Sequence, residues 1–269
     1  MEHKKPRTLK ERVLLGFRIG AAVLLFVVLL ASILFFRSYL LRSPKFDITI
    51  KEIHGLRHVS ESQILLRLRE IEEQDINLIA LDLDQLRKSV EVLPWVKMAT
   101  VRRVLPDRLI IELSERTPIA FARMDRTTLL VDEDAMLLDS KGENLGGFDF
   151  PVLIGLEAGF ETEVLARNKK RIALYRALMK ALDENSAGLS KDVSEIHLQD
   201  AGSVSVVLNE DTVLVHLGGD QFQERFRRYL AMSREIKQKY PLLDSVDLRF
   251  ENQVLINAAN ERIASSSGQ

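Results

Sequence analysis

The chain has 269 residues, 46% of them hydrophobic and 29% charged, which is the composition of a folded protein with one or two domains. It contains no cysteine, which excludes thiol catalysis and thiolate metal sites. Without residues 1–18 the chain holds 32 basic and 37 acidic residues, a net charge of −5, which argues against a nucleic-acid-binding surface.

Residues 19–36 contain no charged residue, and 13 of these 18 residues are Leu, Ile, Val or Phe. At a helical rise of ~1.5 Å per residue the segment spans roughly 27 Å, close to the hydrocarbon thickness of a bilayer. We therefore predict a transmembrane helix at 19–36. The main alternative is a cleaved signal peptide, whose apolar core is about 7–15 residues long and precedes a small-x-small cleavage site. Residues 35–42 offer no such site, which favours an uncleaved anchor.

The residues on either side of this helix predict its orientation. Residues 1–18 hold six basic and two acidic residues, whereas only Arg37, Arg42 and Lys45 follow the helix closely. The positive-inside rule therefore predicts a single-pass type II membrane protein, with a cytoplasmic tail at 1–18 and the bulk of the chain outside the cytoplasm as a periplasmic or surface domain. At the other end, residues 259–269 are small and polar, and we expect them to be disordered.

The first part of the outer region begins with a strand and two helices. Residues 46–53 alternate apolar and polar side chains, as a half-buried strand does. Two helix starts follow, because Ser60 precedes Gln63 and Asp82 precedes Gln85 at the spacing of a capping box. The apolar residues after these caps share one helical stripe in each segment: Ile64, Leu65, Leu68 and Ile71, then Leu83, Leu86 and Val90.

Two further strands complete this part. Pro94 limits the second helix, and side chains then alternate over 96–103 and 109–113, on either side of a turn at Pro106 and Asp107. The predicted order is strand, helix, helix, strand, strand. Two helices packed on one face of a three-stranded sheet bury a core within about 70 residues.

The second part reads as an α+β domain built mainly on an antiparallel sheet. One predicted helix covers 164–182, and another opens at the capping signal of Asp220 and Gln223 and ends near Pro241. The predicted strands lie at 129–131, 136–138, 151–154, 193–198, 204–208, 213–217 and, as one long run, 246–257.

Residues that could carry catalysis or bind a metal are few. His54 and His58 are four residues apart, but Gly55 lies between them in a strand that leads into a turn, so the rings need not converge. The acidic run from Asp132 to Asp134 fits a hairpin turn better than a calcium loop, because it lacks the spaced oxygen ligands. We therefore predict no catalytic residue, no metal and no cofactor, and a protein that is not an enzyme.

One long motif is specific. Residues 94–111 read PWVKMATVRRVLPDRLII, and ERTPIA follows at 115–120. Two shorter matches lie further along, LGGD at 217–220 and VDLRF at 246–250. In this order the motifs resemble the FtsQ/DivIB family of bacterial cell-division proteins, over about residues 19–257.

The resemblance implies an architecture and a role. It implies a POTRA domain at 46–116 and a β domain at 117–258, after the transmembrane helix. It also implies a non-catalytic scaffold of the divisome, located at the division septum. The expected partners are FtsB-like and FtsL-like bitopic membrane proteins, through which the family helps to control the FtsW/FtsI-type septal peptidoglycan synthase.

By the same resemblance, the end of the β domain receives the partner as an added strand. The predicted partner-binding residues are Asp247, Arg249, Phe250 and Glu251. If 246–257 is a single edge strand, alternate residues share a face, and its free N–H and C=O groups are open to the partner. Arg249 would then pair with a partner carboxylate. Two alternatives remain: Phe250, which replaces the family's Tyr, is a core residue, and Arg249 is a solvated rim charge.

In the POTRA domain the motif residues are Pro94, Trp95, Val96, Arg102, Arg103, Pro106 and Asp107. The resemblance implies that this domain serves in recruitment and docking. Trp95 is expected to pack beneath the second helix, and Arg102 and Arg103 to lie on opposite strand faces, so that at most one serves a shared surface. Two other classes are alternatives: a POTRA-bearing transport or assembly module, for which several POTRA repeats would be expected, and an envelope hydrolase, which needs a catalytic cluster.

Overall fold

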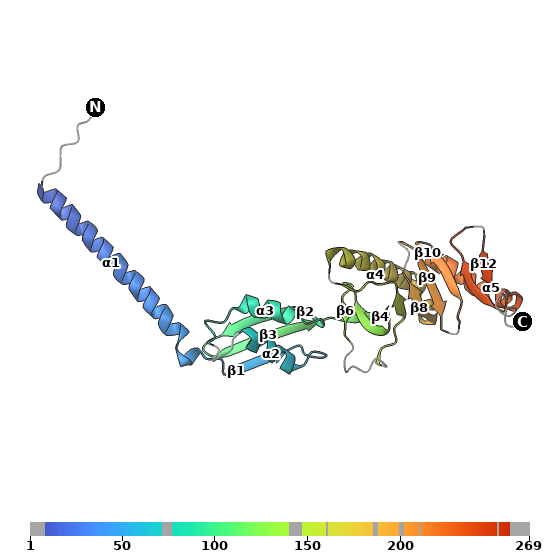
Figure 1. Ribbon diagram of the computed structural model, residues 1–269, viewed down its shortest axis with the longest axis horizontal. Coiled ribbons are helices and arrows are strands. Elements are labelled where there is room, and N and C mark those ends of the chain that lie inside the picture. Colours follow the sequence, from blue (N-terminus) through green and yellow to red (C-terminus); the bar gives the residue numbers. More distant parts are fainter. Residues whose placement is uncertain are drawn as a thin grey trace, which may run out of the picture. The chain divides into compact units, whose positions relative to one another are not determined.

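The computed structural model describes residues 9–71, 77–139, 147–159, 161–184, 188–198, 202–209, 211–251 and 253–258. The chain divides into two compact units, Met1–Glu115 and Arg116–Gln269 (Figure 1). The tail predicted at 259–269 and the first eight residues of the predicted cytoplasmic tail lie outside the described residues.

The first unit begins with one long helix, α1 (Leu9–Leu41). Its apolar part, Phe17–Leu41, has 25 residues with none of the window buried, and it contains the predicted span at 19–36. A helix satisfies its own backbone hydrogen bonds, so an apolar one of this length fits a single membrane span. The helix continues past Arg37 and ends before the short 3-10 helix η1 (Pro44–Phe46), where proline supplies no N–H donor.

A three-stranded sheet and two helices follow in the predicted order. The elements are β1 (Ile50–His54), α2 (Glu61–Ile71), α3 (Leu83–Glu91), β2 (Val96–Val104) and β3 (Arg108–Glu115). The strand order is β1-β3-β2, with β1 parallel and β2 antiparallel to the central β3. The α+β class predicted for this unit is confirmed.

The predicted cap at Asp82 is formed, and at Ser60 the half of the capping box in which Gln63 reaches back to the Ser60 N–H is formed. The Gln63 side chain accepts a hydrogen bond from the N–H of Ser60 at 3.0 Å, and Asp82 Oδ1 accepts from the N–H groups of Asp84 and Gln85. Such caps satisfy N–H groups that a helix start leaves without intrahelical acceptors. The apolar stripes that follow face the core, which contains Ile64, Leu68, Leu86 and Val90.

A β-bulge corrects the predicted alternation of β2. The register of β2 against β3 shifts between Val96 and Met98. Val96 and Ala99 are both buried, whereas Met98, predicted to share a face with Val96, is 58% exposed. A bulge inserts one extra residue into a strand, so a strict period of two fails at this point.

The second unit contains one nine-stranded sheet with two long helices, α4 (Thr162–Asp183) and α5 (Phe222–Lys239). The strand order is β12-β11-β10-β9-β8-β7-β4-β5-β6, and among the described residues five of the eight pairings are antiparallel. The strands are β4 (Pro118–Met124), β5 (Thr127–Asp132), β6 (Leu137–Leu138), β7 (Val152–Ile154), β8 (Val193–His197), β9 (Val204–Leu208), β10 (Leu214–Gly218), β11 (Leu243–Asp247) and β12 (Leu255–Ala258).

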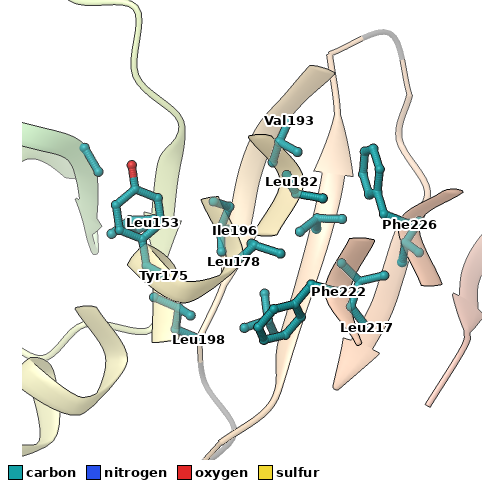
Figure 2. Close-up of a cluster of buried hydrophobic side chains, with 14 of the residues drawn as sticks. Leu153, Tyr175, Leu178, Leu182, Val193, Ile196, Leu198, Leu217, Phe222 and Phe226 are labelled. Atoms are coloured by element: carbon teal, nitrogen blue, oxygen red, sulfur yellow. The ribbon is translucent and has the colours of Figure 1, made fainter. Parts of the chain in front are cut away.

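The core of this unit lies between one face of the sheet and the two helices. Strand register lines up a row of apolar residues across six strands: Leu153, Ile196, Val206, Val215, Val246 and Ile256. Figure 2 shows members of this row beside side chains of α4 and α5 in the same cluster, among them Tyr175, Leu178, Leu182, Phe222 and Phe226. Burial of these side chains is the main stabilising term for the unit.

Two predictions for the second unit are wrong. The run 246–257 is two strands, β11 and β12, joined by a reversal, so its alternate residues do not share one continuous face. The α5 helix has Gln221, in the left-handed region with φ 50°, at its N-cap position, and no side-chain cap is formed. Asp220 instead pairs with Arg225, whose guanidinium nitrogen lies 2.8 Å from its carboxylate.

Candidate partner-binding site

The strand β12 ends the nine-stranded sheet, so on one side it has no neighbouring strand among the described residues. It runs antiparallel to β11, with Ile256 opposite Val246 and Leu255 opposite Asp247. The open side of such a strand presents N–H and C=O groups that an extended peptide can pair with by adding a strand. At the other end of the sheet, β6 has only two residues, so β12 is the longer template.

Asp247 and Arg249 form an ion pair where β11 ends. Arg249 donates from Nη2 to Asp247 Oδ2 at 2.6 Å and from its backbone N–H to Oδ1 at 3.0 Å. Burial raises the pKa of Asp247, but the hydrogen bonds from Arg249 together lower it by more. The pKa of Asp247 is therefore below its ordinary value. The pair fixes the guanidinium beside the sheet edge, where it is 43% exposed.

The stem of Arg249 lies against a glycine. Gly218 has φ 80°, and a Cβ added there would lie 3.3 Å from Arg249 Cγ and 2.8 Å from Arg225 Nη1. Arg225 is buried and donates from Nη1 to the carbonyl oxygens of Leu217, at 2.6 Å, and Asp220, at 3.0 Å. Close packing and the left-handed backbone both select glycine here, which gives the LGGD motif a structural role beside the predicted site.

The reversal between β11 and β12 carries the other two predicted residues. Phe250 is 48% exposed, which rules out the alternative that it is a core residue. The carbonyl oxygen of Glu251 accepts a hydrogen bond from Arg228 Nη1 of α5 at 3.0 Å. The structure therefore brings Asp247, Arg249, Phe250 and Glu251 together at one end of β11, beside the open edge but not on it.

The sheet face opposite the core carries a polar row that ends at this site. The register sets His197, Ser205, His216 and Asp247 side by side on β8 to β11, with Leu255 next on β12. Ser205 Oγ lies 2.7 Å from His216 Nδ1, and burial lowers the pKa of His197. Within the described residues no three His, Asp or Glu side chains converge on a metal position.

Comparison with known proteins gives the family. A family model described as "POTRA domain, FtsQ-type" matches residues 47–116, and one described as "Cell division protein FtsQ/DivIB, C-terminal" matches residues 120–249. The chain belongs to the FtsQ/DivIB family. The resemblance inferred from the motifs at 94–120, 217–220 and 246–250 is thereby confirmed.

Individual FtsQ proteins agree with this assignment. Cell division protein FtsQ of Koribacter versatilis is 37% identical over 210 residues, which are 77% of this chain and 58% of that protein. Cell division protein FtsQ of Allochromatium vinosum is 30% identical over 206 residues, 76% of this chain and 75% of that protein. The solved structure of the major extracytoplasmic domain of the trans isomer of DivIB from Geobacillus stearothermophilus covers 46% of this chain and 97% of its own, with 22% identity and a TM-score of 0.28.

The FtsQ/DivIB match ends at Arg249, so the two later predicted residues and β12 lie beyond it. Their inclusion in a site rests on the geometry of this chain. Sequence reasoning missed Arg225 and Arg228, which support the site from α5. Their only signal is position, because both follow the LGGD motif on the helix that it introduces.

The FtsQ-type POTRA motif residues have mostly structural contacts. Trp95 is buried and stacks on His58, with ring centroids 4.2 Å apart. Arg102 pairs with Glu112 at 3.2 Å, while Arg103 donates to the carbonyl oxygen of Leu81 at 2.6 Å.

The remaining motif residues shape the ends of the strands. Pro94 and Pro106 are exposed and Val96 is buried. Asp107 accepts a hydrogen bond from Thr49 between the start of β3 and the segment before β1. Arg102 and Arg103 each have a contact within the unit, and neither contact identifies a docking surface. The docking role of this domain stays a prediction.

Proposed function

We propose that this member of the FtsQ/DivIB family is a non-catalytic scaffold of the divisome. It binds FtsB-like and FtsL-like bitopic membrane proteins and through them helps to control the FtsW/FtsI-type septal peptidoglycan synthase. It resides in the inner membrane at the division septum, with its N-terminus in the cytoplasm and the chain after α1 in the periplasm. The six basic residues among residues 1–18 support this orientation.

One observation carries the proposal: the sheet of the second unit ends in an open strand, β12, directly beside a positioned cation and an exposed aromatic ring. Backbone pairing along β12 gives affinity that does not depend on the partner's side chains. Arg249 then selects a partner strand with a carboxylate near its end, and Phe250 contributes apolar contact area.

In this arrangement the Arg249 guanidinium contacts two carboxylates, that of Asp247 and one of the partner. A carboxylate of the FtsB-like protein reaches the exposed side of the guanidinium while Asp247 holds the other side. Because the Asp247 carboxylate stays charged at neutral pH, the cation is oriented before the partner arrives, and less entropy is lost on binding.

The test is a pair of proline substitutions in full-length protein, Leu255→Pro and Ile256→Pro. Successive N–H groups of a strand point to opposite sides, so one proline removes a donor on the open edge and the other removes one that faces β11. We expect one variant to lose binding of the FtsB-like partner by at least tenfold with an unchanged melting temperature, and the other to be destabilised.

A second pair tests the ion pair. Arg249→Glu should weaken binding by tenfold or more, while Arg227→Glu, an exposed arginine on α5 with the same charge change, should not. Unchanged partner affinity in both proline variants and in Arg249→Glu would rule out the edge-strand arrangement. A fluorescent fusion that labels the membrane uniformly in dividing cells, without a mid-cell band, would rule out the septal role.

A further inference from the structure

A pocket of about 530 Å³ lies where the membrane-spanning helix passes into the first folded unit. It is formed by the last two turns of α1 and by η1, and its lining residues are Phe35, Ser38, Tyr39, Arg42, Ser43, Pro44 and Lys45. Most of the lining surface is apolar, and two exposed cations, Arg42 and Lys45, provide its charge.

The wall of this pocket is held in place by a buried asparagine. Asn77 donates from Nδ2 to the carbonyl oxygens of Leu40, at 3.2 Å, and Ser43, at 3.3 Å. Next to it, the N–H of Leu78 donates to the carbonyl oxygen of Phe46 at 2.7 Å. The last carbonyl groups of a helix commonly accept hydrogen bonds from basic side chains, but here the amide of Asn77 donates to the carbonyl of Leu40 instead. Arg42 and Lys45 are therefore left for another ligand.

Three cations, Arg37, Arg42 and Lys45, lie within nine residues, and no acidic residue occurs among them. Within the part of the chain that the structure describes, none of the three has an ion pair or a hydrogen bond through its side chain. Exposed cations beside a bilayer attract an anion at its surface. In the described residues no anion of the protein pairs with these three side chains.

The adjoining helix indicates where the anion comes from. None of the apolar window of Phe17–Leu41 is buried, so in a membrane its side chains face acyl chains. Phe35 and Tyr39 belong both to this lipid-facing surface and to the pocket, and aromatic rings at the end of a span lie at the headgroup level. A phospholipid has both components that the pocket fits, a chain for the apolar wall and a phosphate for the cations.

We propose that this pocket binds one anionic phospholipid of the outer leaflet. Its phosphate lies between Arg42 and Lys45, and its acyl chain lies along Phe35 and Tyr39. The proposal depends on the N-inside orientation for the choice of leaflet, but it is independent of any divisome partner. Binding there would tie the start of the first folded unit to the membrane surface, since Asn77 joins the same helix end to that unit.

The experiment uses the full-length protein in detergent micelles, titrated with phosphatidylglycerol or phosphatidylcholine and examined by native mass spectrometry. We expect one phosphatidylglycerol to bind more tightly than phosphatidylcholine. The variant Arg42→Gln/Lys45→Gln should lose roughly 25-fold in affinity, because each cation near a lipid surface contributes about fivefold. The control Lys51→Gln/Arg69→Gln removes the same charge from exposed positions of β1 and α2 and should bind as the unsubstituted chain does.

Four outcomes would overturn the proposal. Equal affinities of the two double variants would show that the cations are not the site. Equal binding of both lipids would show an ordinary lipid-facing surface. Displacement of the lipid by inorganic phosphate would show a site for the free anion. If the pocket variant loses no lipid but loses a bitopic partner, the pocket belongs to that partner. Tyr39→Ala should weaken the binding of both lipids by a similar factor, which would place the acyl chain against Tyr39.

Discussion

Replacement of Arg225 by methionine should destabilise the second unit while it leaves the first unit unchanged. The Arg225 side chain is buried, and its Nη1 donates to two carbonyl oxygens, those of Leu217 and Asp220. Methionine has a similar length and fills the space, but it leaves both carbonyls without this donor. The substitution therefore isolates the polar contribution from the packing contribution.

The magnitude follows from the number of bonds lost. Hydrogen bonds from a charged donor contribute about 1.5–3 kcal/mol each, so the two to the carbonyl oxygens give roughly 3–6 kcal/mol. A third, from Nη2 to Gln221 Oε1 at 3.3 Å, is longer and adds less. Removal of a buried cation regains part of its desolvation cost, and the ion pair to Asp220, which is 74% exposed, adds little because water screens it. We expect a net loss of about 2–3 kcal/mol in the free energy of unfolding, which is roughly 5–10 °C in the melting temperature of a unit of this size.

The two units can be followed separately in the full-length protein. The one tryptophan, Trp95, lies in the first unit, whereas Tyr175, Tyr229 and Tyr240 lie in the second. Tryptophan fluorescence should report an unchanged melting temperature for the first unit. The near-ultraviolet tyrosine signal should report a lowered melting temperature for the second unit. Arg227→Met, at an exposed position two residues along the same helix, is the matched control. Melting temperatures of the two variants within about 1 °C of each other would refute the reasoning.

Two further perturbations test other parts of the second unit. Gly218→Ala should lower the free energy of unfolding by about 1–2 kcal/mol and lower partner affinity, because the added Cβ would crowd Arg249. Gly202 has a similar left-handed backbone (φ 81°) but open space around it. Gly202→Ala should therefore cost less stability and leave binding intact. Hydrogen bonds from Arg167 and then Arg171 lower the pKa of Glu157 to about 2, so its stabilising effect is present above pH ~4.5 and is lost as the pH falls through 2. Urea midpoints measured from pH 7 to pH 2 should therefore fall more steeply for the unsubstituted chain than for Glu157→Gln, and parallel curves would contradict this.

The order of elements could be predicted from the sequence because each signal is local. A charge-free run of 18 residues predicts a helix long enough to span a bilayer, since the bilayer sets the length that must be apolar. The helix starts at Ser60 and Asp82 were predicted because a cap needs only residues three positions apart. The motif from Pro94 to Ala120 carried the family assignment, which the family models then confirmed.

The partner-binding site was predicted only in part, because a period of two encodes which face is buried and not where the chain reverses. Val246 and Leu248 continue an alternation into the segment after β11. The reversal there depends on tertiary contacts, in which Leu248 donates its N–H to the His216 carbonyl and Arg228 holds the Glu251 carbonyl. Neither contact leaves a local sequence signal such as a glycine or proline turn.

The sequence by itself thus determined the long apolar helix, the type and order of most elements, and the family, since these depend on hydrophobic period, capping and motif. Only the tertiary structure decided which strand ends the sheet. It placed β11 beside β10 in parallel and left β12 as the edge, and it turned Asp220 from a predicted cap into a partner of Arg225. Strand order depends on which apolar faces pack together across the whole unit, and that information is spread over residues more than a hundred positions apart, from Leu153 to Ile256.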